Sequence, residues 1–324
     1  MKKRGFEFSF SLIFAILAGL FIIFLALYTT MQFIHTSRYS LDTETAKSLS
    51  IIFNPLETGI EAGKSAYVSF SSETKIYNEC SEIGNFGYQE FSLASKSGIG
   101  PAWQEPGGEI TLRNKYIFSD VTEGKRVYMF STPFEAGFKV ASLTFMYTEK
   151  YCFKNPPEFV EDTIRNLNLA NINLNSSCNE GEITVCFGSG RERDCDMIVS
   201  DNCRAAPSCR EDYDVGYVDK GGERLSYYGN LVYAAIFSSP ELYECNVKRL
   251  AGRTTQLAYL YVDESMFLQG KDCHTGLESD LMQLAAMSQE IKNANHVDLL
   301  SLYGRGNQIK LNAVGECCLW ECVN

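Results

Sequence analysis

The longest apolar run of the chain lies close to its N-terminus. From Phe8 to Ile34 no charged residue occurs, and the central part from Leu12 to Tyr28 is almost wholly apolar. About 20 apolar residues in a helix, at ~1.5 Å each, cross the ~30 Å hydrocarbon core of a bilayer. The pattern predicts a transmembrane helix, and it makes the lipid bilayer a partner of residues 8–34.

The same helix is predicted to continue beyond the bilayer. Apolar positions keep a helical spacing as far as Asn54-Pro55, where a helix is expected to end because the residue before a proline disfavours helical conformation. These positions are Phe33, Leu41, Thr45, Leu49, Ile52 and Phe53. One helix over residues 8–54 would be roughly 70 Å long, and its outer half would present one apolar stripe to the body of the protein.

Charges on either side of the apolar run predict its orientation. The basic residues Lys2, Lys3 and Arg4 lie in the short segment 1–7 and favour a cytoplasmic N-terminus. A removable signal peptide has an apolar region of only ~7 to 15 residues and a small-x-small cleavage site. Since this run is longer and no such site follows it, we expect a retained anchor; a cleaved signal is the alternative.

Residues 55–155 read as a β-rich domain. The expected strands alternate polar with apolar residues and are separated by glycine and proline turns such as Pro106-Gly107-Gly108. We predict an antiparallel sheet or a small sandwich built from the segments Ser65–Ser72, Thr74–Tyr77, Tyr88–Ala94, Ile110–Ser119, Arg126–Ser131 and Phe138–Thr148.

Residues 156–324 read as a second domain that mixes helices with strands. Pro156-Pro157 and the asparagine-rich stretch that follows mark the boundary. Ser239-Pro240-Glu241 combines an N-cap, a first-turn proline and an acid, which together predict the start of a helix. The other expected elements are a helix from Glu158 to Asn166, strands at Ile183–Phe187 and Met197–Val199, a hairpin at Val215–Tyr228 turning at Gly221-Gly222, a helix from Leu277 to Ile291, and a final strand at Gln308–Val314.

Twelve cysteines set the chemistry of the outer part. None lies in the membrane stretch, no CxxC pair occurs, and His35, His274 and His296 lie far from the main cysteine cluster. Structural zinc sites need closely spaced Cys/His pairs, so the pattern favours disulfides formed in an oxidising compartment. The candidates are Cys80, Cys152, Cys178, Cys186, Cys195, Cys203, Cys209, Cys245, Cys273, Cys317, Cys318 and Cys322.

Spacing does not determine how these cysteines pair. A bond between Cys80 and Cys152 would close the first domain and is the one pairing we suggest. Adjacent cysteines rarely bond to each other because the small ring is strained, so Cys317 and Cys318 are expected to bond at two different places. The fold expected overall is α+β, with a transmembrane helix extended into the ectodomain, an antiparallel β-rich domain, and a disulfide-rich α+β domain.

Composition narrows the function classes. The chain has 324 residues, 45% apolar residues and a formal charge of −11. A chain this acidic repels a polyanion, so no nucleic acid is expected as a partner. Asn175-Ser176-Ser177 is an N-glycosylation sequon and fits an exposed extracytoplasmic loop at Asn175.

Catalytic motifs are sparse. Gly188-Ser189-Gly190 lacks the G-x-S-x-G elbow, and His274 is most simply a solvated histidine at a helix start. The acids Glu211, Asp212 and Asp214 lack the glycine-centred loop of a calcium site. Several tyrosines could anchor a partner but fit core positions better: Tyr227, Tyr228, Tyr233, Tyr259 and Tyr261. No catalytic residue, metal or cofactor is expected.

The N-terminus, Lys2-Lys3-Arg4-Gly5 followed by an apolar and then an amphipathic helix, resembles that of type IV pilin-like proteins. In that family a peptidase cuts after the glycine and the helices pack into a filament core, so the resemblance implies a cut after Gly5 with Phe6 as the first mature residue. The acid typical of the fifth mature position is missing, since Glu7 would be the second. The chain is also similar to uncharacterised archaeal single-pass surface proteins that share the start KKRG-x-EFSFS.

Three functions are consistent with these features. The first is a non-enzymatic, membrane-anchored structural or interaction protein of the cell surface, which binds other surface proteins or copies of itself. The second is a pilin-like filament or pseudopilus subunit. The third is an ectoenzyme or a ligand-binding surface protein.

Overall fold

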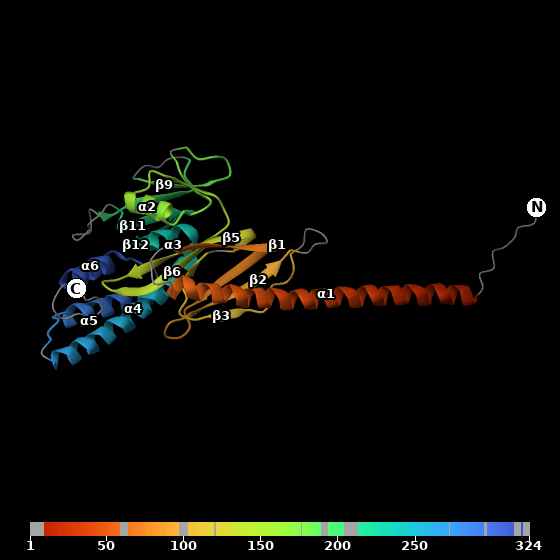
Figure 1. Ribbon diagram of the computed structural model, residues 1–324, viewed down its shortest axis with the longest axis horizontal. Coiled ribbons are helices and arrows are strands. Elements are labelled where there is room, and N and C mark those ends of the chain that lie inside the picture. The colour runs from red at the N-terminus through yellow and green to blue at the C-terminus, as the bar shows by residue number, and fades with distance from the viewer. Residues whose placement is uncertain are drawn as a thin grey trace, which may run out of the picture.

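The structure is a computed structural model that describes residues 10–58, 64–96, 103–119, 121–175, 177–188, 194–203, 213–271, 273–294, 297–313 and 319. It begins with a long helix, α1 (Phe10–Thr58), and the body of the protein lies beside the C-terminal part of that helix only (Figure 1). The expected end of the helix at Asn54-Pro55 is wrong, because α1 runs on to Thr58. A proline this close to the end of a helix removes one backbone hydrogen bond, and the last turn still forms.

The first sheet contains β1 (Lys64–Ser81), β2 (Tyr88–Ser95), β3 (Ile110–Leu112), β4 (Ile117–Phe118), β5 (Thr122–Glu135) and β6 (Lys139–Tyr147), in the order β3-β2-β1-β5-β6-β4. Its neighbouring strands are antiparallel except for the β4–β6 pair. The single strand predicted at Ile110–Ser119 is wrong. Asn114 adopts a positive φ of 55°, and this turn sends β3 and β4 to opposite edges of the sheet.

The second sheet contains β7 (Tyr151–Lys154), β8 (Ile172–Leu174), β9 (Ile183–Phe187), β10 (Met197–Asp201), β11 (Val215–Lys220) and β12 (Glu223–Tyr228), in the order β12-β11-β10-β9-β7-β8. It is parallel from β8 to β10 and antiparallel from β10 to β12. The predicted hairpin over Val215–Tyr228 is confirmed, with Gly221 and Gly222 at positive φ in its turn.

Five further helices follow or interrupt this sheet: α2 (Glu158–Asn166), α3 (Leu231–Phe237), α4 (Pro240–Gln269), α5 (Glu278–Asn293) and α6 (Leu300–Asn312). The N-cap predicted at Ser239 is confirmed, since its hydroxyl accepts a hydrogen bond from the Leu242 amide. The strand predicted at Gln308–Val314 is wrong, because α6 extends to Asn312. Buried residues recur at helical spacing along α6, at Leu302, Tyr303, Gly306 and Ile309.

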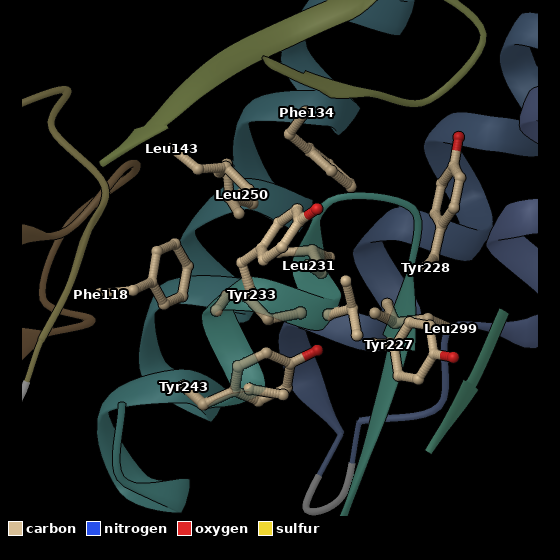
Figure 2. Close-up of a cluster of buried hydrophobic side chains, with 14 of the residues drawn as sticks. Phe118, Phe134, Leu143, Tyr227, Tyr228, Leu231, Tyr233, Tyr243, Leu250 and Leu299 are labelled. Carbon is tan, nitrogen blue, oxygen red and sulfur yellow. The ribbon is translucent and has the colours of Figure 1, made fainter. Parts of the chain in front are cut away.

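One aromatic core joins the two sheets and the helices. Every residue of α3 is buried, and its Tyr233 packs edge-on against Phe130 of β5 with ring centroids 5.6 Å apart. Figure 2 shows Tyr233 among side chains from α4, from β12 and from the first sheet. Since the same cluster contains residues from both sheets, the two halves of the body share one core and support each other's packing.

Candidate functional site

The N-terminal part of α1 is the most distinctive surface of the molecule. Its apolar window has a mean hydropathy of 2.9, and none of that window is buried within the protein. Large apolar side chains stay exposed as far as Leu41, which is 60% exposed. The structure therefore contains one N-terminal helix that is long and apolar enough to cross a membrane.

The helix meets the body at Asp42, where the side chain is 5% exposed. The Asp42 carboxylate accepts hydrogen bonds from the amide and the hydroxyl of Ser95, each at 3.0 Å. On the next residue, the Thr43 hydroxyl accepts a bond of 2.7 Å from the amide of Gly108. A Cβ on Gly107 would lie 2.8 Å from the Thr43 nitrogen, so glycine allows this close approach.

Apolar contacts extend this attachment toward the C-terminal end of α1. Ala46 and Leu49 are buried in a second core cluster, together with Ile76, Leu93 and Val127 of the first sheet. The predicted contact between the apolar stripe and the body is therefore confirmed at Leu49. It is wrong at Leu41, which stays exposed. The C-terminal part of α1 packs against the first sheet, mainly against β2.

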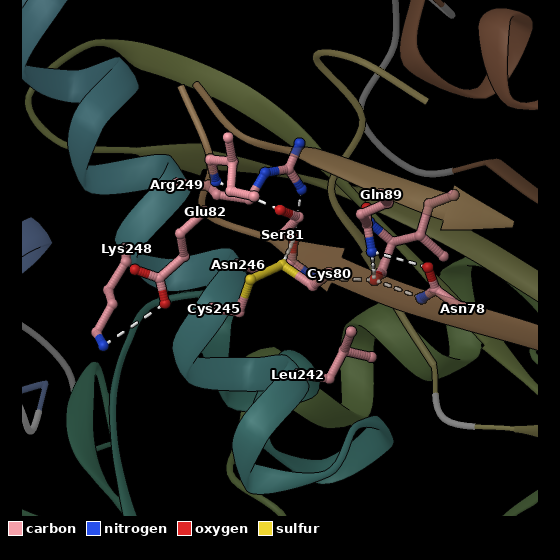
Figure 3. Close-up of a disulfide and its surroundings, with 12 residues drawn as sticks. Asn78, Cys80, Ser81, Glu82, Gln89, Leu242, Cys245, Asn246, Lys248 and Arg249 are labelled. Atoms are coloured by element: carbon pink, nitrogen blue, oxygen red, sulfur yellow. Dashed lines mark hydrogen bonds and ion pairs between the residues drawn. A yellow bond between two sulfur atoms is a disulfide. The ribbon is translucent and has the colours of Figure 1, made fainter. Parts of the chain in front are cut away.

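A disulfide links the first sheet to the helical part of the body. Cys80 of β1 bonds to Cys245 of α4, which lies 165 residues later in the chain, and Figure 3 shows this bond at the end of the strand. The suggested Cys80–Cys152 pairing is wrong. Cys152 lies on β7 in the second sheet, and its partner is Cys178.

The predicted disulfide chemistry is confirmed for the described cysteines. A third bond joins Cys186 to Cys195, and Cys203 and Cys273 are also disulfide-bonded. Cys209, Cys317, Cys318 and Cys322 lie outside the described residues, as do the processing candidates Gly5 and Phe6. The expectation that Cys317 and Cys318 bond at different places therefore stays a prediction.

A buried polar network surrounds the Cys80–Cys245 bond. The Arg249 side chain is 2% exposed; it donates to the carbonyl of Phe86 at 3.0 Å and to Asn246 Oδ1 at 2.7 Å. Burial lowers the pKa of Arg249, and its guanidinium lies over the ring of Tyr116. These bonds hold the turn between β1 and β2 against α4. Figure 3 shows Arg249 and Asn246 close to the disulfide.

The described polar and aromatic candidates lie in different parts of the body, apart from Asp214 and Tyr228, which line one cleft. His274 is exposed, and the nearby Glu278 accepts a hydrogen bond of 2.6 Å from Ser265, the largest cause of its lowered pKa. Asp214 accepts a bond from the Tyr303 hydroxyl at 3.0 Å. Tyr227, Tyr228 and Tyr233 are core residues, whereas Tyr259 is 50% exposed on α4. Ser189, Glu211 and Asp212 lie outside the described residues.

One cluster resembles a metal site by composition. Cys152, Cys178 and Glu182 lie within ligand distance of one another. Both sulfurs belong to one disulfide, and a disulfide sulfur carries no thiolate for a metal. The sequon residue Asn175 lies in the same region, exposed and directly after β8.

Open clefts indent the described surface. One, of about 390 Å³, lies between the first sheet and the loop that follows α2. A second, of about 250 Å³, lies beside the β5–β6 turn and α6 and includes Asp214 and Lys310. A third, of about 240 Å³, lies beside β12 and α4. No signal in the sequence pointed to the first of these, because its walls come from segments far apart in the chain.

Comparison with models of known protein families, with characterised proteins and with solved structures finds no match.

Proposed function

We propose that this protein is a single-pass membrane protein whose body lies outside the cytoplasm and acts, without catalysis, by binding other surface proteins or copies of itself. The observation that carries the proposal is the bare apolar half of α1, which is attached rigidly to a disulfide-bonded body. Disulfides persist in oxidising compartments, which supports an extracytoplasmic body. The three basic residues before the helix support a cytoplasmic N-terminus.

The length of the bare helix supports an interaction role. Residues 10–41 lie ahead of the contact with the body, and at ~1.5 Å each they extend about 48 Å, against a hydrocarbon core of ~30 Å. The bilayer therefore covers only part of this surface. Leu41, which is 60% exposed, lies beyond the predicted span of residues 8–34 and next to the body. Exposed apolar side chains of this size favour coverage by another protein surface.

A photo-cross-linker tests this proposal in the native membrane. With p-benzoylphenylalanine in place of Leu41, we expect a covalent adduct with a second copy or with another surface protein. The matched control is the same substitution at Ile83, which is 74% exposed but lies on the body, and it should give no such adduct. Absence of an adduct at Leu41, or equal adducts at both positions, would contradict the proposal.

A second candidate, a pilin-like filament or pseudopilus subunit, is favoured by one observation. The C-terminal part of α1 packs on a mainly antiparallel sheet, while its N-terminal part stays bare and could pack against copies of itself. Intact mass and N-terminal sequencing of the protein from its native membrane distinguish the candidates. A mature start at Phe6 supports the subunit, whereas a start at Met1 supports the uncleaved anchor.

A further inference from the structure

Three tyrosines form a row across neighbouring strands of the first sheet. Tyr67 of β1 is directly opposite Tyr128 of β5, and Tyr128 is directly opposite Tyr147 of β6. Directly opposed residues project from the same face of a sheet. With strands ~4.8 Å apart, the row is about 10 Å long. The rings of Tyr128 and Tyr147 stack with centroids 5.7 Å apart.

The exposure of the three tyrosines decreases along the row. Tyr67 is 64% exposed, Tyr128 is half-buried and Tyr147 is buried. All three line the cleft of about 390 Å³, a volume within the ~300 to 1,000 Å³ typical of small-molecule sites. The guanidinium of Arg126 lies 5.1 Å from the Tyr67 ring centre and orders that ring at the mouth of the cleft.

Hydrogen bonds join the two walls of the cleft, which are the sheet and the loop after α2. The Ser65 hydroxyl donates to the carbonyl of Leu167 at 2.7 Å, and the Tyr147 hydroxyl donates to the carbonyl of Ala170 at 2.8 Å. These two bonds fix the position of the loop after α2 relative to the sheet, and so they fix the distance between the two walls of the cleft. Asn168 is exposed at the loop wall, where its side-chain amide can reach a ligand; its backbone N–H donates to the Arg165 carbonyl.

The chemistry of the lining selects among ligand classes. The lining residues carry no carboxylate, ammonium or guanidinium group: Ser65, Ala66, Tyr67, Tyr128, Met129, Tyr147, Asn168, Leu169 and Ala170. A cationic ligand would lose hydration there without a countercharge, and the Arg126 guanidinium beside the lining is already stacked on the Tyr67 ring. A sugar ring has apolar C–H faces that stack on aromatic rings, and its hydroxyls both donate and accept, as the Asn168 amide does. A proline-rich peptide offers few donors to the same groups.

We infer that the cleft between β1, β5, β6 and the loop after α2 binds a neutral oligosaccharide, with Tyr67 and Tyr128 as the stacking platform and Asn168 as a hydrogen-bonding partner. An extracytoplasmic surface would meet such chains on neighbouring cells or on glycosylated proteins. The inference does not depend on whether α1 assembles with other copies.

Calorimetric titration of the full chain in detergent micelles tests the inference. The probes are neutral linear hexasaccharides of glucose, mannose and N-acetylglucosamine at millimolar concentration. We expect at least one to bind, and Tyr67→Ala to weaken that binding by ~10-fold or more, about 1.4 kcal/mol. Tyr128→Phe should retain most of the affinity, because it keeps the ring. Tyr259→Ala, which removes a tyrosine 50% exposed on α4, should leave the affinity unchanged.

Thermal unfolding of each variant serves as the folding control. Truncating an exposed tyrosine leaves stability almost unchanged, so a folded Tyr67→Ala protein with lost affinity supports the site. Failure of all three sugars to bind the wild type overturns the inference. It is overturned equally if affinity survives Tyr67→Ala, or if only a proline-rich peptide binds in the cleft.

Discussion

Removal of the Cys80–Cys245 disulfide should destabilise the body more than removal of either of the two short-range disulfides. In the chain-entropy description, the gain in stability rises with the logarithm of the closed loop. The Cys80–Cys245, Cys152–Cys178 and Cys186–Cys195 bonds close loops of 165, 26 and 9 residues. The corresponding contributions at 25 °C are about 5, 3.5 and 2.5 kcal/mol. The short loops lie inside the long one, which reduces its effective length but changes the logarithm little.

The assay compares three double variants, each with both cysteines of one bond replaced by alanine. Thermal unfolding of the full chain in detergent is followed by far-ultraviolet circular dichroism, and non-reducing peptide mapping confirms that the other bonds remain. For a body of this size, ~1 kcal/mol shifts Tm by roughly 2 to 4 °C. Loss of Cys80–Cys245 should therefore lower Tm by ~10 to 20 °C, about twice the effect expected for Cys186–Cys195.

The rank order is the informative result. If loss of the Cys186–Cys195 bond lowers Tm as much as loss of Cys80–Cys245 does, loop closure does not explain the stabilisation. The stability that each bond provides would then depend on the local packing around it. At Cys80–Cys245 that packing includes the hydrogen bond between Arg249 and Asn246.

Three further predictions concern single residues. Leu49→Ala should cost ~2 to 5 kcal/mol in the free energy of unfolding, because the buried side chain leaves a cavity between α1 and the first sheet; Leu41→Ala, at an exposed position, is the control in the same denaturant titration. Ser265→Ala should raise the lowered pKa of Glu278 toward its ordinary 4.5 in an NMR titration. The stability from that hydrogen bond is complete above about pH 4.5 and is lost as pH falls through the lowered pKa; an unchanged pKa would refute the assignment. Native protein should carry glycan mass on the peptide containing Asn175, and Asn175→Gln should remove it; an unmodified wild-type peptide in mass spectrometry contradicts this.

Local signals in the sequence predicted many elements of the body correctly. The glycine turn of the β11–β12 hairpin and the N-cap at Ser239 depend on neighbouring residues only, and both are confirmed. Alternating segments likewise predicted β2, β5 and β6 near their observed places. The predicted strand at Gln308–Val314 failed because a short apolar pattern fits a strand or a helix. The close packing of Gly306 against Ala136 and Gly137 accommodates α6 at this place.

The candidate oligosaccharide site could not be predicted from sequence. Tyr128 follows Tyr67 by 61 residues, and Tyr147 follows Tyr128 by 19 residues. They meet only because β1, β5 and β6 are neighbours in a particular register. Asn168 reaches the same cleft through a loop that two hydrogen bonds tie to the sheet.

The sequence by itself determined an apolar helix of membrane-spanning length and a cysteine-rich body, because both follow from composition along a continuous stretch of chain. Tertiary structure alone decided that Cys80 pairs with Cys245 and that the C-terminal part of α1 packs against the first sheet. These contacts join residues far apart in sequence, and their positions follow from strand order and helix packing. Such an arrangement is set by the burial of two core clusters built from distant segments, which no local pattern encodes.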